Sequence, residues 1–324
     1  MITHRRRKFA AIALAAILLA TALASGGAAL PKMGMPLDSD STDWVALYYA
    51  ETGEKAGGSS ATGFGSGSGV SSASSLYPYA NFKKSISDYA AVNPDIKGWL
   101  HIPNTNMSSP IAFNGSQDNN YYLYRDWKGT NYPGITWQNW SSYPNCVTYL
   151  DYRTKLNSSW NASSWNMVLY GHNWNNLRAP FGIGNYDNLT MFGQLPSYTD
   201  INFATKNPHI YFSTGEMEGI WRVFAVGYTV NTPKFFYNSP NPGKEQRQFL
   251  VDEWRDYSLF DFNVEVDSTD RLLTLTTCTR QYPNLGDAQR FVVVARLLRE
   301  GESENDVVTA TVNPDIQAPT AALG

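Results

Sequence analysis

The sequence predicts a mainly β protein, and two observations support that prediction. The first is a pair of strands near the end of the chain, 271–278 and 290–296, in which apolar and β-branched residues dominate. Between them lie Pro283, Asn284 and Gly286, which favour turns. The second is composition: only 16% of the residues are charged, while Trp, Tyr, Asn and Ser are abundant. This composition is typical of a β-rich extracellular protein with a polar, uncharged surface.

The N-terminal part of the chain predicts export. Residues 1–8 form a basic N-terminus that we expect to remain cytoplasmic, and 9–24 is an uninterrupted run of apolar and small residues with one Thr. A run of 16 residues is shorter than the roughly 20 of a comfortable membrane span, so it fits a signal segment or a membrane anchor. Residues 25–76, rich in Gly and Ser, are predicted to be a flexible linker.

The next elements alternate between short strands and loops. A helix comes first, because Phe82, Ile86 and Tyr89 recur at helical spacing before Asn93 and Pro94 end it. We then expect strands over 99–102, 109–113, 147–152 and 167–170, a short helix over 119–125, and polar or aromatic loops over 130–144, 157–165 and 173–184.

The C-terminal half contains the longest predicted elements. A short helix near 191–195 precedes a hairpin of strands 209–212 and 219–230, and a helix over 243–257 carries Phe249, Leu250 and Trp254 on one face. Residues 301–324 have no periodicity and are predicted to be a disordered tail. We interpret His101 and His209 as structural, since each lies within or at the start of a strand.

Three side chains with complementary chemistry are predicted at strand ends. Cys278 ends one strand, Arg290 begins the next, and His172 follows the strand 167–170. A thiol is a good nucleophile only as thiolate, and a free Cys with a pKa of ~8.5 is a few per cent ionised at neutral pH. A nearby imidazole would handle protons, and a guanidinium would stabilise an oxyanion. The set suits acyl transfer, although Arg280 competes with Arg290 for the guanidinium role.

These residues fall in segments that together resemble the signature segments of sortases: Tyr170-Gly-His-Asn173, Thr274-Leu-Thr-Thr-Cys278 and Arg290-Phe-Val-Val-Val-Ala-Arg296. The long insertion before the Cys278 strand is similar to that of class B. The resemblance covers roughly residues 77–300, which we therefore expect to be a sortase catalytic domain. It implies a closed, eight-stranded, sortase-type β-barrel with an N-terminal helix and a helical insertion before the Cys278 strand.

The resemblance also implies a function. Cys278 would cleave the C-terminal sorting signal of a secreted protein at a Thr–Gly or Thr–Asn bond, leaving a thioester. An amine of a peptidoglycan precursor or a pilin subunit would resolve it. His172 would act as acid and base and Arg290 as oxyanion donor, since the family pattern of Arg, a bulky apolar residue and two valines falls on Arg290. The residues expected to bind substrate are Tyr170, Thr232, Phe236, Thr276 and Thr277.

The resemblance further favours an uncleaved anchor at 9–24, which predicts a single-pass protein of the cell membrane with an extracellular catalytic domain. We expect no cofactor and no metal site, because no His, Cys and Glu spacing indicates zinc. The 25 basic and 28 acidic residues create no basic field, so we expect no nucleic-acid partner.

Two other functions stay open at this point. One is a cysteine hydrolase of the same fold, whose acyl-enzyme is resolved by water. The other is a non-catalytic, wall-binding β-domain, suggested by the Trp, Tyr and Asn loops. Cys146, the second of only two cysteines, is interpreted as a small buried hydrophobe, because a disulfide with Cys278 would consume the nucleophile.

Overall fold

The computed structural model describes most of the chain after residue 78. The described residues are 79–136, 138–159, 161–184, 189, 191–215, 217, 219–230, 238–317 and 319. The segments expected to be a basic N-terminus (1–8), an anchor or signal segment (9–24) and a linker (25–76) lie outside them.

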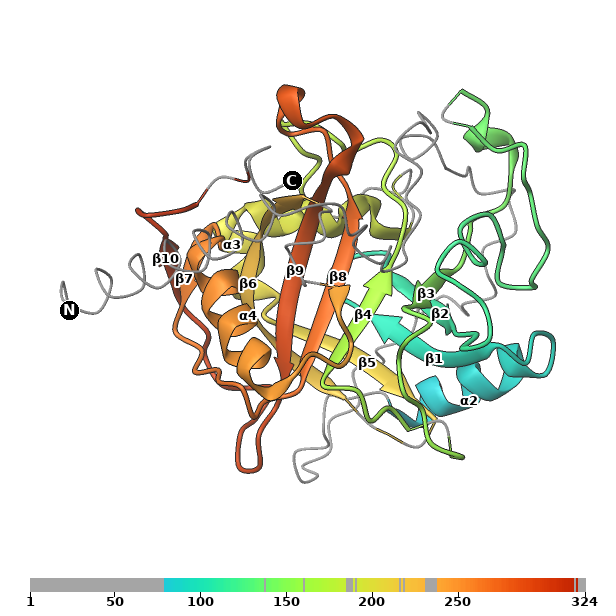
Figure 1. Cartoon of the computed structure of the whole chain (residues 1–324), viewed down its shortest axis with the longest axis horizontal. Coiled ribbons are helices and arrows are strands. Elements are labelled where there is room, and N and C mark those ends of the chain that lie inside the picture. The colour runs from blue at the N-terminus through green and yellow to red at the C-terminus, as the bar shows by residue number, and fades with distance from the viewer. Residues whose placement is uncertain are drawn as a thin grey trace, which may run out of the picture. The chain divides into compact units, whose positions relative to one another are not determined.

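Eight strands form the main sheet, and their pairing order closes on itself as β1-β2-β3-β4-β8-β9-β6-β5 (Figure 1). The first strand, β1, pairs with both β2 and β5, which completes the ring. The strands are β1 (Ile96–His101), β2 (Ser108–Ala112), β3 (Thr148–Leu150), β4 (Asn166–Tyr170), β5 (His209–Thr214), β6 (Ile220–Val230), β8 (Leu272–Cys278) and β9 (Gln289–Leu297). The mainly β prediction is therefore confirmed.

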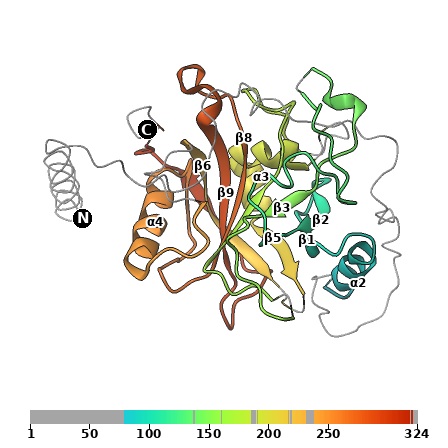
Figure 2. The same cartoon turned by 45° about the vertical axis from the view of Figure 1, so that its right-hand side comes forward.

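In the described part of the chain, helices are few and short. They are α2 (Tyr79–Ala90), α3 (Ile201–Lys206) and α4 (Lys244–Asp256), together with the 3₁₀ helices η2 (Trp140–Ser142), η3 (Met191–Thr199) and η5 (Pro283–Ala288). Figure 2 shows α2 beside β1, and the buried side chains of Phe82, Ile86 and Tyr89 form the packed face of this helix, as their spacing predicted. The insertion before β8 contains α4, whose N-terminus is capped by a hydrogen bond between the Gln246 side chain and the Gly243 main-chain nitrogen.

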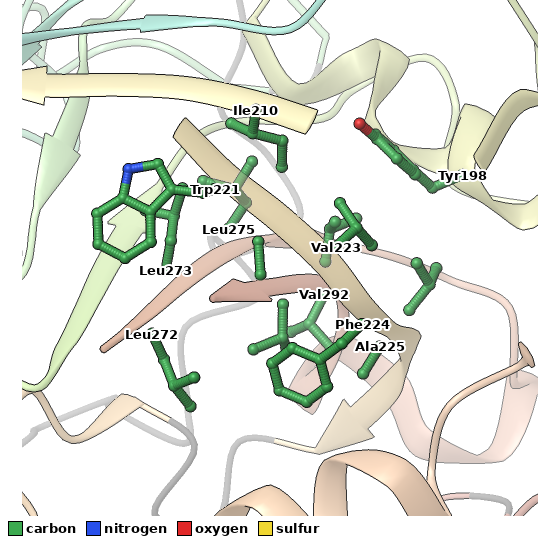
Figure 3. Packing of buried hydrophobic residues seen from close by; sticks show 14 of the residues in the cluster. Tyr198, Ile210, Trp221, Val223, Phe224, Ala225, Leu272, Leu273, Leu275 and Val292 are labelled. Atoms are coloured by element: carbon green, nitrogen blue, oxygen red, sulfur yellow. The ribbon is translucent and has the colours of Figure 1, made fainter. Parts of the chain in front are cut away.

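The main core lies between the long strands. Figure 3 shows apolar side chains of β6 and β8 packing together with Val292 of β9 and Tyr198 of η3. Both Leu273 and Leu275 of β8 are fully buried, and so is Trp221 of β6. Because β8 is buried along its first six residues, its register is fixed before it reaches Cys278.

Three predictions about elements are wrong. Residues 119–125 form a run of turns instead of a helix, because Asp118 accepts a hydrogen bond from the main-chain nitrogen of Asn120 and the buried Asn119 amide bonds to Asp151. Such local side-chain bonds compete with the helical ladder. On α4, Leu250 and Trp254 are buried as predicted, but Phe249 is 46% exposed and does not share their face.

The third correction concerns the tail expected over 301–324. Its residues Ala310–Val312 form β10, which pairs antiparallel with β7 (Phe260–Phe262) in a separate two-stranded sheet. Val308 is buried beside them, and the side chain of Asn313 donates to the carbonyl oxygen of Ser258 at 2.8 Å. These main-chain and amide bonds fix a segment whose apolar pattern alone is too weak to predict structure.

The predicted single-pass membrane location is contradicted within the described part of the chain. No helix there is both long enough and apolar enough to cross a membrane. The segment 9–24, on which that prediction rested, is among the residues that the structure does not describe.

Candidate active site

Cys278 is the last residue of β8, where the strand leaves the core. On one side β8 pairs in parallel with β4, and on the other it pairs antiparallel with β9. The thiol is free of any disulfide and half-buried, whereas the six strand residues before it are buried. A thiol at this position is rigidly held and still accessible.

His172 is placed beside Cys278 by the parallel pairing of β4 with β8. In this ladder Tyr170 is the partner of Thr276, so two further residues along each strand lead to His172 and Cys278. The side chain of Asn173 then donates to the carbonyl oxygen of Cys278 at 3.3 Å. Two residues far apart in sequence therefore meet at one rim of the sheet.

Gly171 makes this close approach sterically feasible. Its main-chain nitrogen donates to the carbonyl oxygen of Thr276 at 3.3 Å, and its own carbonyl oxygen accepts from Thr277 Oγ1 at 2.6 Å. A Cβ atom at this position would lie 2.6 Å from the ring of Phe192, a distance that real Cβ atoms do not tolerate. Glycine is therefore required directly before His172.

Arg290, the second residue of β9, is the ladder partner of Cys278. Its side chain is buried at 8% exposure, and Nη1 donates to the carbonyl oxygens of Asp287 and Gln289 at 2.6 and 2.9 Å. These two main-chain acceptors hold the guanidinium at the same rim as the thiol.

Arg280, the competing candidate, points to a different set of partners. It forms an ion pair with the carboxylate of Asp287, and its Nη1 donates to the carbonyl oxygen of Gly286 at 3.2 Å. Its main-chain nitrogen donates to Leu177. Arg280 thus stabilises the turn between β8 and β9 and also connects this turn to the loop after β4.

A single cavity collects most of the predicted site residues. It is lined by Leu123, Tyr149, Tyr170, Gly171, His172, Thr276, Thr277, Cys278 and Arg290. The structure thus brings together the three side chains predicted for catalysis and three of the five predicted for substrate binding. Arg280, His101 and His209 are not among its lining residues.

The hydroxyl groups in the cavity differ in how they are engaged. Tyr170 donates to the Asp151 carboxylate at 2.9 Å, and Thr277 donates to Gly171. Thr276 is 2% exposed, and its Oγ1 has no hydrogen-bond partner among the described residues. Buried hydroxyl groups usually have a partner, so Thr276 is an exception among the hydroxyl groups that line the cavity.

The two other residues predicted to bind substrate, Thr232 and Phe236, lie outside the described residues. Leu123 and Tyr149 line the cavity although the sequence did not single them out. Tyr149 is the ladder partner of Tyr170, and their rings lie 5.4 Å apart. Strand alternation would have found Tyr149, whereas Leu123 lies in the turn region and no sequence pattern points to it.

Burial makes His172 a neutral imidazole. Its side chain is 9% exposed, and burial lowers its pKa to about 4, against a smaller opposing effect of its hydrogen bond to the Leu123 carbonyl oxygen. One face of the ring stacks on Trp174, with centroids 5.5 Å apart. At neutral pH this imidazole is therefore unprotonated, and its low pKa makes it a weaker base than an exposed histidine.

The amino-acid sequence of the chain is similar to those of sortase B proteins. The chain is 27% identical over 191 residues to sortase B of Listeria monocytogenes, a match that covers 59% of this chain and 65% of that protein. The chain therefore spans just under two thirds of the length of this relative. It is 26% identical over 208 residues to sortase B of Staphylococcus aureus, covering 64% of this chain and 72% of that one. No protein-family model matches the chain.

Solved structures carry the same fold. The X-ray structure of Clostridium perfringens sortase B aligns with a TM-score of 0.52 at 22% identity and covers 66% of this chain and 99% of that chain. At this identity the likeness concerns the fold alone.

Proposed function

We propose, from the premise that the chain is a sortase class B-like protein, that it is a cysteine transpeptidase in which Cys278 is the nucleophile. One observation carries the proposal: Cys278, His172 and Arg290 line the same cavity. The ring of eight paired strands supports a closed, sortase-type barrel as the scaffold of residues 77–300.

The first half of the reaction forms a thioester. The Cys278 thiol gives its proton to the neutral His172 imidazole, and the sulfur attacks the carbonyl carbon of the scissile amide. The C–N bond then breaks, the leaving amine takes the proton from His172, and the acyl group stays on sulfur. The low pKa of His172 makes its protonated form a strong acid for this second proton transfer.

Arg290 is suited to stabilise the charge that develops on the carbonyl oxygen. Its guanidinium is already fixed by two main-chain carbonyl groups, so little reorganisation accompanies the reaction. A buried cation near the developing oxyanion interacts more strongly than one in water.

Substrate binding is assigned to the hydroxyl and aromatic groups of the cavity. Thr276 lines the cavity with an Oγ1 that has no partner among the described residues and would bond to the peptide main chain after a small local movement, while Tyr170 and Thr277, engaged with the protein, shape the wall. We infer that the peptide is a C-terminal sorting signal of a secreted protein.

The second half transfers the acyl group to an amine. The incoming amine attacks the thioester carbonyl, loses a proton to His172, and the C–S bond breaks as the sulfur regains that proton. We propose an amine of a peptidoglycan precursor or of a pilin subunit as acceptor. Water as acceptor would instead make the protein a hydrolase.

Mass spectrometry of the intact protein tests the proposal. Incubation with a panel of sorting-signal peptides should add the mass of the N-terminal peptide fragment to the wild-type protein, and Cys278→Ala should gain none. Cys146 remains in that variant, so it serves as an internal control for the site of acylation. An added amine should release the fragment as an amide. A protein that binds wall material equally well with and without the Cys278 thiol, and never forms the adduct, would be a wall-binding domain.

A further inference from the structure

Cys146 is a buried thiol that the proposed reaction does not use. It is 2% exposed and lies just before β3, and burial raises the pKa of its thiol well above the usual value. The group is therefore a neutral S–H at any ordinary pH. Its Sγ donates to the carbonyl oxygen of Leu123 at 3.1 Å.

The same oxygen also accepts from the candidate base. Nε2 of His172 lies 3.0 Å from the carbonyl oxygen of Leu123. A carbonyl oxygen only accepts hydrogen bonds and has two lone pairs, so Nε2 must carry the imidazole proton. In the neutral ring Nδ1 is then unprotonated, and it is the one ring atom able to receive the proton of the Cys278 thiol.

We propose that Cys146 is a positioning residue for His172, acting through the carbonyl oxygen of Leu123 to which both side chains donate. This inference rests on the proposed function, in which His172 is the base. The Cys146 thiol would favour the His172 tautomer that carries its proton on Nε2, which is the tautomer able to accept the Cys278 proton on Nδ1.

The chain around Leu123 explains why its carbonyl needs a second donor. Leu123 lies in a run of turns, and its own nitrogen bonds only to the preceding turn, at Asn120. Part of the connection to the sheet comes from the residues around Cys146: an isolated bridge pairs Cys146 with Asp126, and Val147 donates its main-chain N–H to the carbonyl oxygen of Arg125. The Cys146 side chain extends this attachment to the carbonyl group that faces His172.

The residues packed around Cys146 also restrain the ring of His172 by a second contact. Cys146, Leu123, Ile135 and Trp174 form one small group of buried residues, and Trp174 stacks on the imidazole. Both known restraints on the ring, a hydrogen bond and a stacked face, therefore pass through the residues that surround Cys146. A loss of the thiol bond would allow the proton to move to Nδ1, where it blocks acceptance of the Cys278 proton.

Three substitutions separate the hydrogen bond from packing. Cys146→Ala removes the donor and some volume, Cys146→Val removes the donor while filling the space with a slightly larger apolar side chain, and Cys146→Ser keeps a donor. Val147→Ala is a matched control, since Val147 is buried in a different cluster. The full chain has four histidines, so the ring nitrogens of His172 are assigned by comparison with His172→Gln in ¹⁵N NMR spectra.

The expected result is a shared change in the Ala and Val variants. Their His172 spectra should shift from the Nε2–H form toward a mixture of tautomers, and their rates of thioester formation should fall about threefold to tenfold, the size expected for one neutral hydrogen bond. Cys146→Ser should keep the wild-type tautomer and most of the rate. Val147→Ala should lower the melting temperature without changing the tautomer.

The two proposals fail in different ways. A wild-type tautomer together with a wild-type rate in both Cys146→Ala and Cys146→Val overturns the positioning role and leaves the chemistry of Cys278 intact. If no variant, and not the wild type, forms a thioester while the tautomer still shifts in the Ala and Val proteins, the positioning role stands and the transpeptidase proposal falls.

Discussion

At the scale of single residues, Arg290 illustrates how the site is organised. Its guanidinium is planar, and Nη1 donates to the carbonyl oxygens of Asp287 and Gln289, while its strand position makes it the ladder partner of Cys278. A lysine could supply the charge but not the fixed fork of donors. The geometry of the group matters here as much as its charge.

Replacing Arg290 should therefore slow thioester formation strongly. Arg290→Ala and Arg290→Lys are both expected to lower the rate about 10²-fold or more, the effect of losing one preorganised oxyanion donor. Arg280→Ala is the matched control, since Arg280 bonds to Asp287 and Gly286 and does not line the cavity. Single-turnover kinetics measure the acylation rate of each variant. An equal loss of rate in Arg280→Ala would contradict the assignment of the oxyanion role to Arg290.

The pKa of His172 leads to a prediction about stability. Burial lowers this pKa to about 4, below the ordinary value of about 6.5, so between these pH values the unfolded chain binds a proton that the folded chain does not. The free energy of unfolding therefore rises with pH between about 4 and 6.5, and the stability linked to His172 is fully present above about pH 6.5 and is lost as the pH falls toward 4. The size of this contribution is on the order of 3 kcal/mol.

Denaturant unfolding across this pH range provides the measurement. His172→Gln should show a flatter rise of the free energy of unfolding between pH 4 and 6.5. His209, whose pKa burial and Arg222 also lower to about 4, leaves a residual slope in that variant. Identical slopes in the variant and the wild type would mean that His172 titrates normally.

At the scale of elements, the junction between β4 and the loop after it depends on close packing. Gly171 connects the strand to His172, and η3 approaches it through the ring of Phe192. The neighbouring β8 bonds to Gly171 on its other side. Three elements thus converge on one residue without a side chain.

Gly171→Ala should disturb stability and activity together. The added Cβ overlaps the Phe192 ring, and such overpacking costs typically about 1–3 kcal/mol of the free energy of unfolding. Because the backbone carrying His172 must shift, thioester formation should also slow. Gly134→Ala is the control, since the nearest atom to its new Cβ is the Tyr143 hydroxyl at 3.7 Å. In denaturant unfolding, Gly134→Ala should have a free energy of unfolding close to that of the wild type. A wild-type value for Gly171→Ala would contradict the packing argument.

How far the sequence could predict these elements depends on where their hydrogen bonds go. Strand ends such as Cys278 and His172 follow from apolar runs, and the order of the motifs indicated that they meet. The turns around Leu123 and the strand β10 could not be predicted, because their bonds run to distant main-chain groups or to local Asn and Asp side chains. The role of Leu123 depends on a carbonyl group, which every residue has, so no residue type could reveal it.

At the scale of the whole described region, charges join the end of β9 to the chain that follows it. Arg296 is 1% exposed and donates to both carboxylate oxygens of Glu302 at 2.5 Å. Arg222 of β6 donates to the same carboxylate at 3.3 Å and to Asp306 at 2.8 Å. The hydrogen bonds from Arg296 lower the pKa of Glu302 to about 2.

Glu302→Gln should destabilise the protein, because it leaves the buried guanidinium of Arg296 without its counter-charge. Breaking such a pair costs about 3 kcal/mol or more. The carboxylate's contribution is present above its unfolded pKa of about 4.3 and is lost as the pH falls toward 2, so the difference between variant and wild type should shrink in acid. Glu265→Gln is the control: its partner Arg299 lies 3.5 Å away, its side chain is 92% exposed, and little change is expected. A variant at position 302 that unfolds like the control would show that Arg296 is stable without the pair.

The parallel pairing of β4 with β8 has a consequence for how the protein matures. The imidazole and the sulfur come from positions 172 and 278, and no short turn links two parallel strands. Contacts between such remote segments form slowly, after local structure. Under the proposed mechanism, a newly made chain therefore carries its thiol without its base and stays unreactive toward peptides until β4 and β8 have paired.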